Sequence, residues 1–410
     1  MMPTVPIRPE PILTNADTRA QRGSAAYRKI SLALFLAGFA TFSLLYCVQP
    51  LLPAFAQDFR VSPAQSSLAL SLSTGFLAVA ILCASAVSEV LGRRGLMFSS
   101  ICAAACLNIV AALVPDWHAL LVARALEGLL LGGVPAVAMA YLAEEMHPKG
   151  LGLAMGLYVS GTAFGGMIGR VGVGVLTEWA SWRVALGSVG VIGLLAAVGF
   201  IALLPPSRHF VRRPSFEAGY HLRAWAKHLS HPGLPWLFGV GFLMMGAFVT
   251  VYNYVGFRLM AAPYGLSQAA ISLVFTAYLF GIVASSTAGA LADRLGRGPV
   301  MTAGIVIAAL GLVLTLSHSL WGVIGGIAGL TIGFFIAHAV ASGWVGRIAQ
   351  GHKGHAASLY LLAYYLGSSV MGSAGGWFWA EGGWPAVVAF AGALFALAFM
   401  AARRLRPPAH

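Results

Sequence analysis

The chain has 410 residues, of which 59% are hydrophobic and only 37 carry a formal charge (25 Lys and Arg, 12 Asp and Glu). So few charges cannot hydrate the surface of a soluble fold of this length. The aromatic share of 11% is too high for a disordered chain, so these numbers predict an integral membrane protein.

Apolar runs near 20 residues, the length that crosses about 30 Å of hydrocarbon, occur in two sets of six. The first set has the approximate limits 30–55, 66–88, 95–114, 119–142, 150–177 and 184–204. The second set has the approximate limits 235–258, 267–291, 299–317, 321–346, 356–379 and 384–402. The runs are too long for barrel strands and show no alternation of period two. We therefore predict an all-α membrane protein with twelve transmembrane helices in two six-helix bundles.

Polar segments divide the chain into five expected parts. These are an N-terminal tail, a first bundle, a linker, a second bundle and a C-terminal tail, at 1–29, 30–204, 205–234, 235–402 and 403–410. The segments expected in the cytoplasm hold 20 Lys and Arg and the opposite loops hold 3, which places both termini in the cytoplasm. The net charge of +13 is then a topology signal that faces anionic lipid, and we expect no nucleic-acid partner.

The fourth expected span contains two ionisable residues, Arg124 and Glu127. Glu127 lies about 13 Å along the helix from its outer start, and Arg124 is one turn shallower on the same face, so the two can pair. Charges in a membrane are costly and usually functional, and such a pair can take up or release a proton when its surroundings change. The alternative is a static ion pair that holds the helix in register.

The fifth expected span is rich in glycine at spacings that permit close helix contact. The packing glycines we single out are Gly161, Gly165, Gly166 and Gly169. Arg170 follows them, about 30 Å from the inner end of the span. We expect its side chain to extend to the outer membrane surface.

The linker carries four histidines among its cations. They are His209, His221, His228 and His231. We expect a solvated basic connector, because no metal-ligand spacing recurs; a metal site or pH sensor is the alternative. The four cysteines lie in apolar runs, and we interpret them as packing residues. No metal and no cofactor is expected.

A constant shift of 204 residues relates the two halves. It takes Gln49 to Asn253, and it relates further pairs, Phe76 to Phe280 and Gly150 to Gly354. An even number of spans per repeat gives both halves the same orientation, with a pseudo-twofold axis along the membrane normal. A substrate cavity on this axis is the functional interpretation of Gln49, Asn253, Tyr252, Tyr364 and His338. Mutual hydrogen bonding inside a bundle is the alternative.

The same shift relates two short loops. The second loop reads Gly289-Ala-Leu-Ala-Asp293-Arg294-Leu-Gly296-Arg297, and the first reads Ser85-Ala-Val-Ser-Glu89-Val90-Leu-Gly92-Arg93-Arg94. The second closely resembles the loop between spans eight and nine of the major facilitator superfamily, whereas the first has Val90 where the family has Arg and Glu89 where it has Asp. The resemblance covers nearly the whole chain and is greatest to the bacterial drug:proton antiporter group, near the arabinose-efflux-permease-like inner-membrane exporters.

This resemblance implies roles for the loops and for spans four and five. Glu89 would face the start of the eleventh span near Gly354, and Asp293 the start of the fifth near Gly150, as latches of a closed cytoplasmic side; a tight turn is the alternative. Arg124 and Gly128 match a proton-coupling motif in which Glu127 replaces Gln. In the antiporter motif of the fifth span, however, Gly166 stands where Pro is expected and Arg170 where Gly is expected.

The function that these observations favour is secondary active transport in the bacterial inner membrane. We expect proton-coupled efflux of a small solute (a drug, sugar or metabolite) by a monomer whose partners are substrate, protons and lipid. No phosphate-binding loop is present, so ATP is not the expected energy source. The alternatives are a uniporter or importer of sugars or metabolites and, more remotely, a membrane-embedded enzyme or lipid-handling protein. No enzyme motif of the His-Glu-x-x-His or Gly-x-Ser-x-Gly type occurs.

Overall fold

The computed structural model describes residues 19–210 and 218–405, which are helical without any extended strand. The first half contains α1 (Ala25–Tyr46), η1 (Gln49–Leu51), α2 (Leu52–Asp58), α3 (Pro63–Leu91), α4 (Arg93–Leu113), α5 (Trp117–Leu131), α6 (Pro135–Glu145), α7 (Pro148–Trp179) and α8 (Trp182–Leu203). The second half contains α9 (Ala218–Leu229), α10 (Leu234–Met260), α11 (Gln268–Ser272), η2 (Leu273–Ala277), α12 (Tyr278–Leu295), α13 (Arg297–Leu314), α14 (Leu320–Ile348) and α15 (Lys353–Arg404).

Ten helical stretches of the described chain are long and apolar enough to cross a membrane. The fourth expected span is not among them because it is broken between Leu131 and Pro135 into α5 and α6. α15 covers both of the last two expected spans, since Gly382 and Gly383 leave the helical conformation in its middle. With these two differences, the described helices supply the twelve expected crossings.

The two repeated loops turn sharply at equivalent glycines. Gly92, between α3 and α4, has φ 92°, and Gly296, between α12 and α13, has φ 90°. Residues with a Cβ rarely adopt such positive φ values. The shared conformation explains why the 204-residue shift preserves a glycine at this point of both loops.

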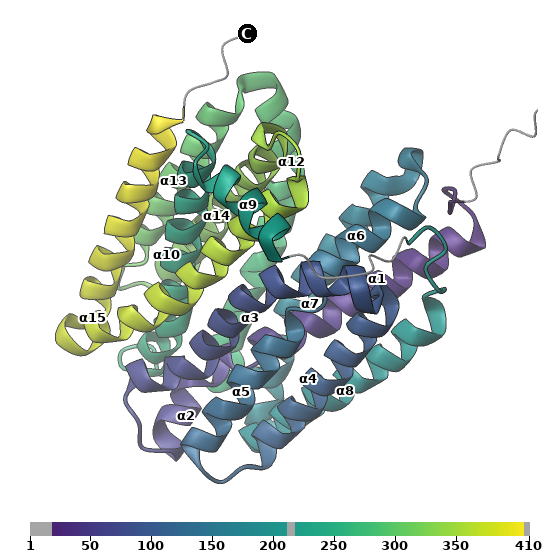
Figure 1. The fold of residues 1–410 in the computed structure, drawn as a ribbon. Helices are drawn as coiled ribbons and strands as arrows, with labels where there is room; N and C mark the ends of the chain where they lie inside the picture. Colours follow the sequence, from purple (N-terminus) through teal and green to yellow (C-terminus); the bar gives the residue numbers. More distant parts are fainter. Residues whose placement is uncertain (1–18, 211–217, 406–410) are drawn as a thin grey trace, which may run out of the picture.

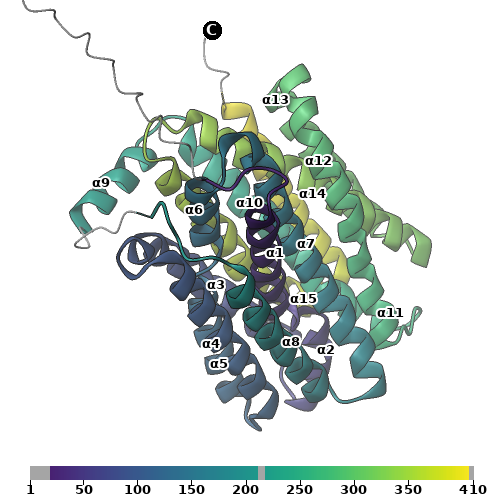
Figure 2. The same cartoon turned by 90° about the vertical axis from the view of Figure 1, so that its right-hand side faces the viewer.

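The helices form two bundles that converge at one end and diverge at the other (Figure 1). We call the end where α1 begins and α15 finishes the termini side, and the end that carries α2 and the Gly382–Gly383 bend the far side. Towards the far side, α3 packs on α15, α11 packs on α7 and η1 and α2 contact α10, and α11 is seen beside the lower part of α7 in Figure 2.

Hydrogen bonds between the halves lie in this convergent region. The Ser373 hydroxyl bonds the Ser71 hydroxyl (2.7 Å), and the Ser369 hydroxyl donates to the Ser71 carbonyl (2.7 Å). The Ala269 N–H donates to the Glu178 carboxylate (3.0 Å). The two halves are therefore closed against each other towards the far side.

The termini side shows a different arrangement. Asp293 accepts hydrogen bonds from Arg297 (3.1 Å) and Arg347 (3.3 Å), both in its own half. The Gly150 carbonyl instead accepts a bond from the Tyr27 hydroxyl (2.9 Å). The expected contact between Asp293 and Gly150 is thus not made in this conformation, and the Glu89 side chain lies outside the described residues.

Three of the four predicted packing glycines face α1. A Cβ on Gly161 would lie 2.5 Å from the Phe35 carbonyl oxygen, one on Gly165 would lie 2.2 Å from that of Phe39, and one on Gly169 would lie 2.8 Å from the Cα of Ser43. A Cβ on Gly166 would instead lie 3.1 Å from Nη1 of Arg170. The closeness of α1 and α7 depends on these missing side chains, because a Cβ would overlap the α1 backbone.

Candidate functional site

The first polar cluster forms where the first span breaks. α1 ends at Tyr46, and Pro50, four residues on, has no N–H to offer the Tyr46 carbonyl. Arg124 on α5 occupies this end: Nη1 donates to the Leu44 carbonyl (3.2 Å) and Nη2 to the Leu45 carbonyl (2.7 Å). A cation is favourable at the negative end of a helix dipole. Arg124 therefore completes the terminus of α1 from another helix.

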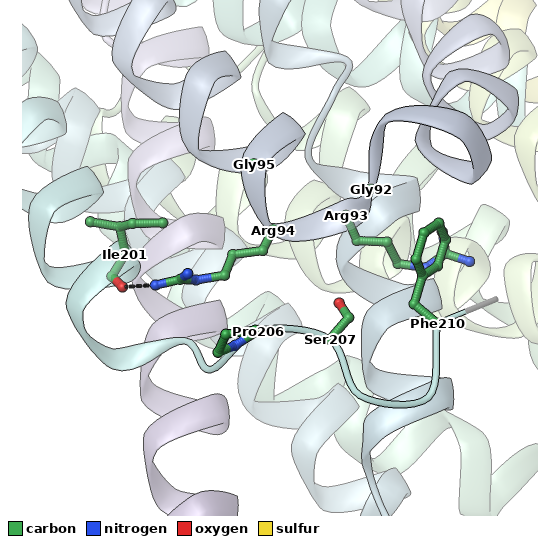
Figure 3. Close-up of a pocket in the computed structure, with 8 residues that line it drawn as sticks. All are labelled: Gly92, Arg93, Arg94, Gly95, Ile201, Pro206, Ser207 and Phe210. Atoms are coloured by element: carbon green, nitrogen blue, oxygen red, sulfur yellow. Dashed lines mark hydrogen bonds between the residues drawn. The ribbon is translucent and has the colours of Figure 1, made fainter. Parts of the chain in front are cut away.

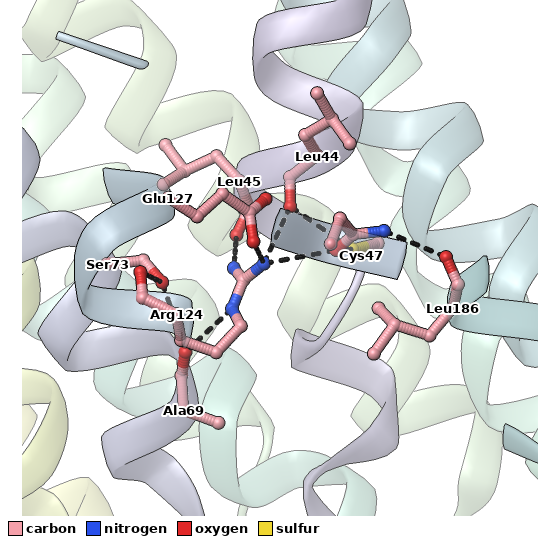
Figure 4. A network of polar contacts seen from close by, with 9 residues as sticks. Leu44, Leu45, Cys47, Ala69, Ser73, Arg124, Glu127 and Leu186 are labelled. Carbon is pink, nitrogen blue, oxygen red and sulfur yellow. Dashed lines mark hydrogen bonds and ion pairs between the residues drawn. The ribbon is translucent and has the colours of Figure 1, made fainter. Parts of the chain in front are cut away.

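Glu127 forms the expected ion pair with Arg124, and both side chains are fully buried (Figure 4). The second carboxylate oxygen of Glu127, Oε1, has no hydrogen-bond partner among the described residues. Arg124 also donates to the Ala69 carbonyl on α3 (3.1 Å) and to the Asn108 side chain (3.3 Å). The cluster thus links four helices and keeps one carboxylate oxygen free to receive a proton.

Arg170 forms a second buried cluster, and the expectation that its side chain reaches the outer surface was wrong. The side chain is only 2% exposed. Nine residues, or about 14 Å of helix, separate it from Trp179 at the end of α7, which is further than the side chain extends. It turns inward instead, where Nε donates to Gln49 Oε1 (2.7 Å) and Nη1 to the Gly166 carbonyl (2.7 Å).

Aromatic rings from both halves surround the Arg170 guanidinium. Its Cζ lies 4.0 Å from the ring centroid of Tyr46, 4.9 Å from that of Tyr278 and 5.3 Å from that of Phe275. A cation over a ring face is attracted by the ring quadrupole. Tyr278 and Phe275 were missed by the sequence analysis, because no motif or repeat distinguishes them from other aromatic residues of the chain.

Gln49 and Asn253, the amides related by the repeat, contact each other across the two halves. Gln49 Nε2 donates to Asn253 Oδ1 at 2.8 Å, and the two residues are 2% and 1% exposed. Asn253 Nδ2 donates weakly to the Gly372 carbonyl on α15 (3.4 Å). Arg170, Gln49 and Asn253 therefore form a continuous hydrogen-bonded chain from α7 through η1 to α10.

The other three predicted cavity residues lie within the second half. Tyr252 forms a hydrogen bond with the Thr331 hydroxyl (2.8 Å). Its ring stacks on that of Phe275 at 5.2 Å between centroids, and Phe275 is one of the rings that contact Arg170. His338 bonds the Tyr360 hydroxyl through Nδ1 (2.9 Å), and its ring lies 4.7 Å from that of Tyr364. The structure thus brings His338 and Tyr364 together and keeps Tyr252 apart from them.

The first loop motif borders a small pocket of about 260 Å³ on the termini side (Figure 3). Arg94 donates to the Ile201 carbonyl on α8 (2.7 Å), and Arg93 lies over the ring of Phe210 at 5.2 Å. Arg93 also donates to Glu144 on α6 through Nε (2.6 Å). These loop cations therefore fasten α3 and α4 to the rest of the first half and to the start of the linker.

The linker is not the solvated connector that we expected. α9 packs on the start of α15: His221 Nδ1 bonds His355 Nε2 at 2.9 Å, and His228 Nε2 bonds the His352 carbonyl at 3.2 Å. His221 and His228 are 5% and 3% exposed. His221 and His228 are seven residues apart, which is about two turns of an amphipathic helix, so both rings lie on one face. No group of three metal-ligating side chains was found within the described residues.

The sequence profile of the Major Facilitator Superfamily matches residues 34–260 and 254–410 of this chain. The chain therefore belongs to this family of membrane transporters, and it is a multi-pass transporter rather than an enzyme.

Individual relatives agree with this assignment. The chain is 44% identical over 390 residues to the inner membrane transport protein YnfM of Escherichia coli K12, covering 95% of this chain and 93% of the relative. It is 44% identical over 371 residues to the MFS-type transporter YybF of Bacillus subtilis 168, covering 90% and 92%. The nucleoside transporter NupG superposes with a TM-score of 0.76 at 15% identity over 92% of this chain and 100% of that one. A bacterial homologue of the lysosomal transporter Spinster gives a TM-score of 0.74 at 16% identity over 94% and 99%.

Proposed function

We propose that this transporter exchanges protons for a small solute that it exports from the bacterial cytoplasm by alternating access. The distribution of Lys and Arg, 20 against 3, supports a cytoplasmic position of the termini side. The conformation described above is then the one open towards the cytoplasm. A single chain is a sufficient transporting unit in this proposal, because it supplies both halves of the interface.

The observation that carries the proton-coupling part is the fully buried Glu127 carboxylate, whose Oε1 has no partner in the described part of the chain. A proton added at Oε1 would remove the charge that balances Arg124 without displacing any other hydrogen bond. Arg124 holds the last carbonyls of α1, at Leu44 and Leu45. Gln49, four residues after Leu45, bridges to the other half. Protonation at Glu127 is thereby linked through the end of α1 to the contact between the halves.

A proton gradient is a sufficient energy source for this exchange. One charge crossing a potential of 100 mV provides about 2.3 kcal/mol. Raising a solute concentration tenfold costs about 1.4 kcal/mol. One proton per solute therefore supports an uphill gradient of more than tenfold without nucleotide hydrolysis.

The first test uses purified full-length protein in proteoliposomes that contain a pH-sensitive dye. A mixed panel of dyes, sugars and amino acids is applied, and substrate-dependent proton flux is recorded together with solute movement. In Glu127→Gln we expect the proton flux to fall at least tenfold while solute exchange across the membrane continues. Glu381→Gln is the matched control, because Glu381 is an exposed carboxylate beside the Gly382 bend, and it should behave as wild type. Intact coupled flux in Glu127→Gln would reduce the Arg124–Glu127 pair to a structural role.

Facilitated movement of the solute without proton coupling is a second candidate function. It is favoured by the departures of Gly166 and Arg170 from the antiporter motif of the fifth span. The same experiment separates the two, because solute movement in wild type with no accompanying pH change supports a uniporter.

A further inference from the structure

Among the described side chains, the membrane interior of this transporter holds two cations, Arg124 and Arg170, but one carboxylate, Glu127. Arg124 and Arg170 are both buried, and Glu127 pairs with Arg124. No carboxylate among the described side chains contacts Arg170, whose hydrogen bonds go to an amide and a backbone carbonyl. The interior therefore carries one positive charge that the described protein groups leave unbalanced.

The positions of the remaining acidic residues explain why none of them neutralises Arg170. Four lie at the far-side ends of helices or in the loops between them, namely Asp58, Asp116, Glu178 and Glu381. Three lie at termini-side ends, namely Glu144, Glu145 and Asp293. The last four of the 12 fall by sequence in the N-terminal tail, at the end of α3 and in the linker, namely Glu10, Asp17, Glu89 and Glu217. No acidic side chain that the structure describes supplies the balancing anion for Arg170.

The Arg170 guanidinium also keeps capacity for another acceptor. Nε and Nη1 are engaged by Gln49 and Gly166, whereas Nη2 carries no hydrogen bond among the described residues. Neutral acceptors and ring faces orient a guanidinium but leave its charge in place, and an unbalanced charge in hydrocarbon is strongly unfavourable. A planar guanidinium binds a carboxylate through two parallel hydrogen bonds, which the amide oxygen of Gln49 does not provide.

Arg170 lies at the inner edge of the closed region between the halves. One turn further along α7 towards the far side, Gly174 packs against Ser272, where a Cβ would lie 2.1 Å from the Ser272 Cβ. Gln268 donates to the Pro50 carbonyl in the same layer. A solute that enters from the divergent side would therefore meet Arg170 and its aromatic rings before it meets the contacts that close the far side.

We propose that Arg170 binds the carboxylate of the transported solute, which is an organic monoanion with an apolar or aromatic body. This inference rests on the proposed transport function and adds its substrate class. One arginine without a neighbouring lysine balances one negative charge, which favours a carboxylate over a phosphate dianion. The rings of Tyr46, Phe275 and Tyr278 supply the apolar contacts for the body of the solute.

Binding of this kind also acts on the contact between the halves. The carboxylate takes the place of Gln49 Oε1 as the acceptor from Arg170, and Gln49 at the same time bridges to Asn253 of the other half. A solute that displaces Gln49 therefore loosens the hydrogen-bonded chain that joins α7, η1 and α10. Binding of a negatively charged substrate is in this way linked to opening of the far side.

The test compares benzoate, benzamide and benzylammonium, which share a ring and differ in charge. Binding to the purified full chain is measured by thermal stabilisation and by calorimetry, and transport by flux into proteoliposomes made of phosphatidylcholine alone, so that no anionic lipid competes. In wild type we expect benzoate to bind at least tenfold more tightly than benzamide or benzylammonium. This preference should vanish in Arg170→Gln, persist more weakly in Arg170→Lys and remain unchanged in the control Arg183→Gln, whose arginine lies at the far-side surface.

The outcomes separate this inference from the proposed function. Tighter binding of the amide or the ammonium in wild type overturns the inference without requiring any variant to fold. If phenyl phosphate competes with the transported solute for binding and benzoate does not, the assignment of the substrate as a carboxylate is overturned. Coupled transport of a neutral or cationic solute that persists in Arg170→Gln overturns the substrate class while the transport function stands. Absence of any flux of any solute in wild type overturns the transport function itself.

Discussion

Single glycines of α7 determine how closely it approaches α1. Gly165 and Gly172 lie on the same helix, yet a Cβ at Gly165 would come within 2.2 Å of the Phe39 carbonyl oxygen, whereas a Cβ at Gly172 would meet nothing within 4 Å. Backbone atoms of a packed helix cannot move aside as the tip of a side chain can. The two positions therefore separate the packing role of a glycine from its effect on helix propensity.

We expect Gly165→Ala to destabilise the protein by about 1–3 kcal/mol through overpacking against α1. The apparent melting temperature in detergent should fall by a few degrees. Gly172→Ala, its control, should leave the melting temperature unchanged or raise it slightly, because alanine stabilises a helix relative to glycine. Equal melting temperatures of the two variants would contradict the packing role of Gly165.

The sequence predicts those site residues whose partners are fixed by a simple spacing. Arg124 and Glu127 are three residues apart on one helix, so their pairing follows from the spacing. Gln49 and Asn253 are related by the repeat, which indicated equivalent positions but not the hydrogen bond between them. Arg170 is different, because its position depends on Tyr278 and Phe275 of the other half. A contact between elements about 100 residues apart depends on how the halves dock, which no local pattern specifies.

At the scale of elements, α9 shows how a polar linker becomes part of the fold. Its His221 ring bonds that of His355, so at most one of these two nitrogens carries the shared proton. Burial lowers the pKa of His228 below its usual 6.5, although its bond to the His352 carbonyl opposes this effect; His352, Lys227 and His231 lower it further by charge repulsion. Burial of α9 against α15 therefore favours the neutral imidazole of His228. The linker composition alone did not predict this, because the partners of α9 lie at the start of the eleventh span.

We expect α9 to detach from α15 as the pH falls. The docked form has the lower His228 pKa, so protons bind preferentially to the detached form, and docking is at full strength above about pH 6.5 and weakens below it. Amide hydrogen exchange in 218–229, corrected for intrinsic rates, should be slow at pH 7.5 and faster at pH 5.5. The variant His221→Gln/His228→Gln should show a smaller pH effect, and amides of α4 should show none. Exchange in α9 that does not change with pH would exclude this dependence.

At the scale of the whole molecule, span number and repeat follow from sequence, but the conformation does not. Lengths of apolar runs determine the twelve crossings, and even the merged α15 has the expected bend near Gly382. Which side is closed depends on small differences between two sets of contacts, such as Ser71 with Ser373 on one side and the proposed contact of Asp293 with the start of α7 near Gly150 on the other. The first set is formed here and the second is not.

A pair of cysteines at Ser71 and Ser373 should therefore cross-link readily. The two hydroxyl oxygens are 2.7 Å apart, and the substitutions are made in a background from which the four native cysteines have been removed. Oxidation should form the Ser71→Cys/Ser373→Cys disulfide and stop transport, and a reductant should restore it. Cleavage at a protease site inserted in the linker detects the cross-link on a gel.

The control pair is Gly150→Cys with Asp293→Cys on the termini side. It should resist oxidation in the resting protein and cross-link only when the far side is held open. Cross-linking of this pair at rest, or failure of the first pair, would contradict the conformation described here.

The closure between α3 and α15 relies on hydroxyl groups, from Ser67, Ser71, Ser369 and Ser373. The termini side carries ion pairs within each half, Arg93 with Glu144 in the first and Asp293 with Arg297 and Arg347 in the second. Dissolved ions screen charges over about 10 Å at 0.1 M, but they leave bonds between hydroxyls almost unaffected. In the orientation we propose, the far side meets an environment of variable salinity, and salt does not weaken the hydroxyl contacts of its closure; the bond from Ala269 to the Glu178 carboxylate is a charged contact beside them. In the same proposed orientation, the ion pairs of the termini side face the cytoplasm, whose salt content the cell regulates.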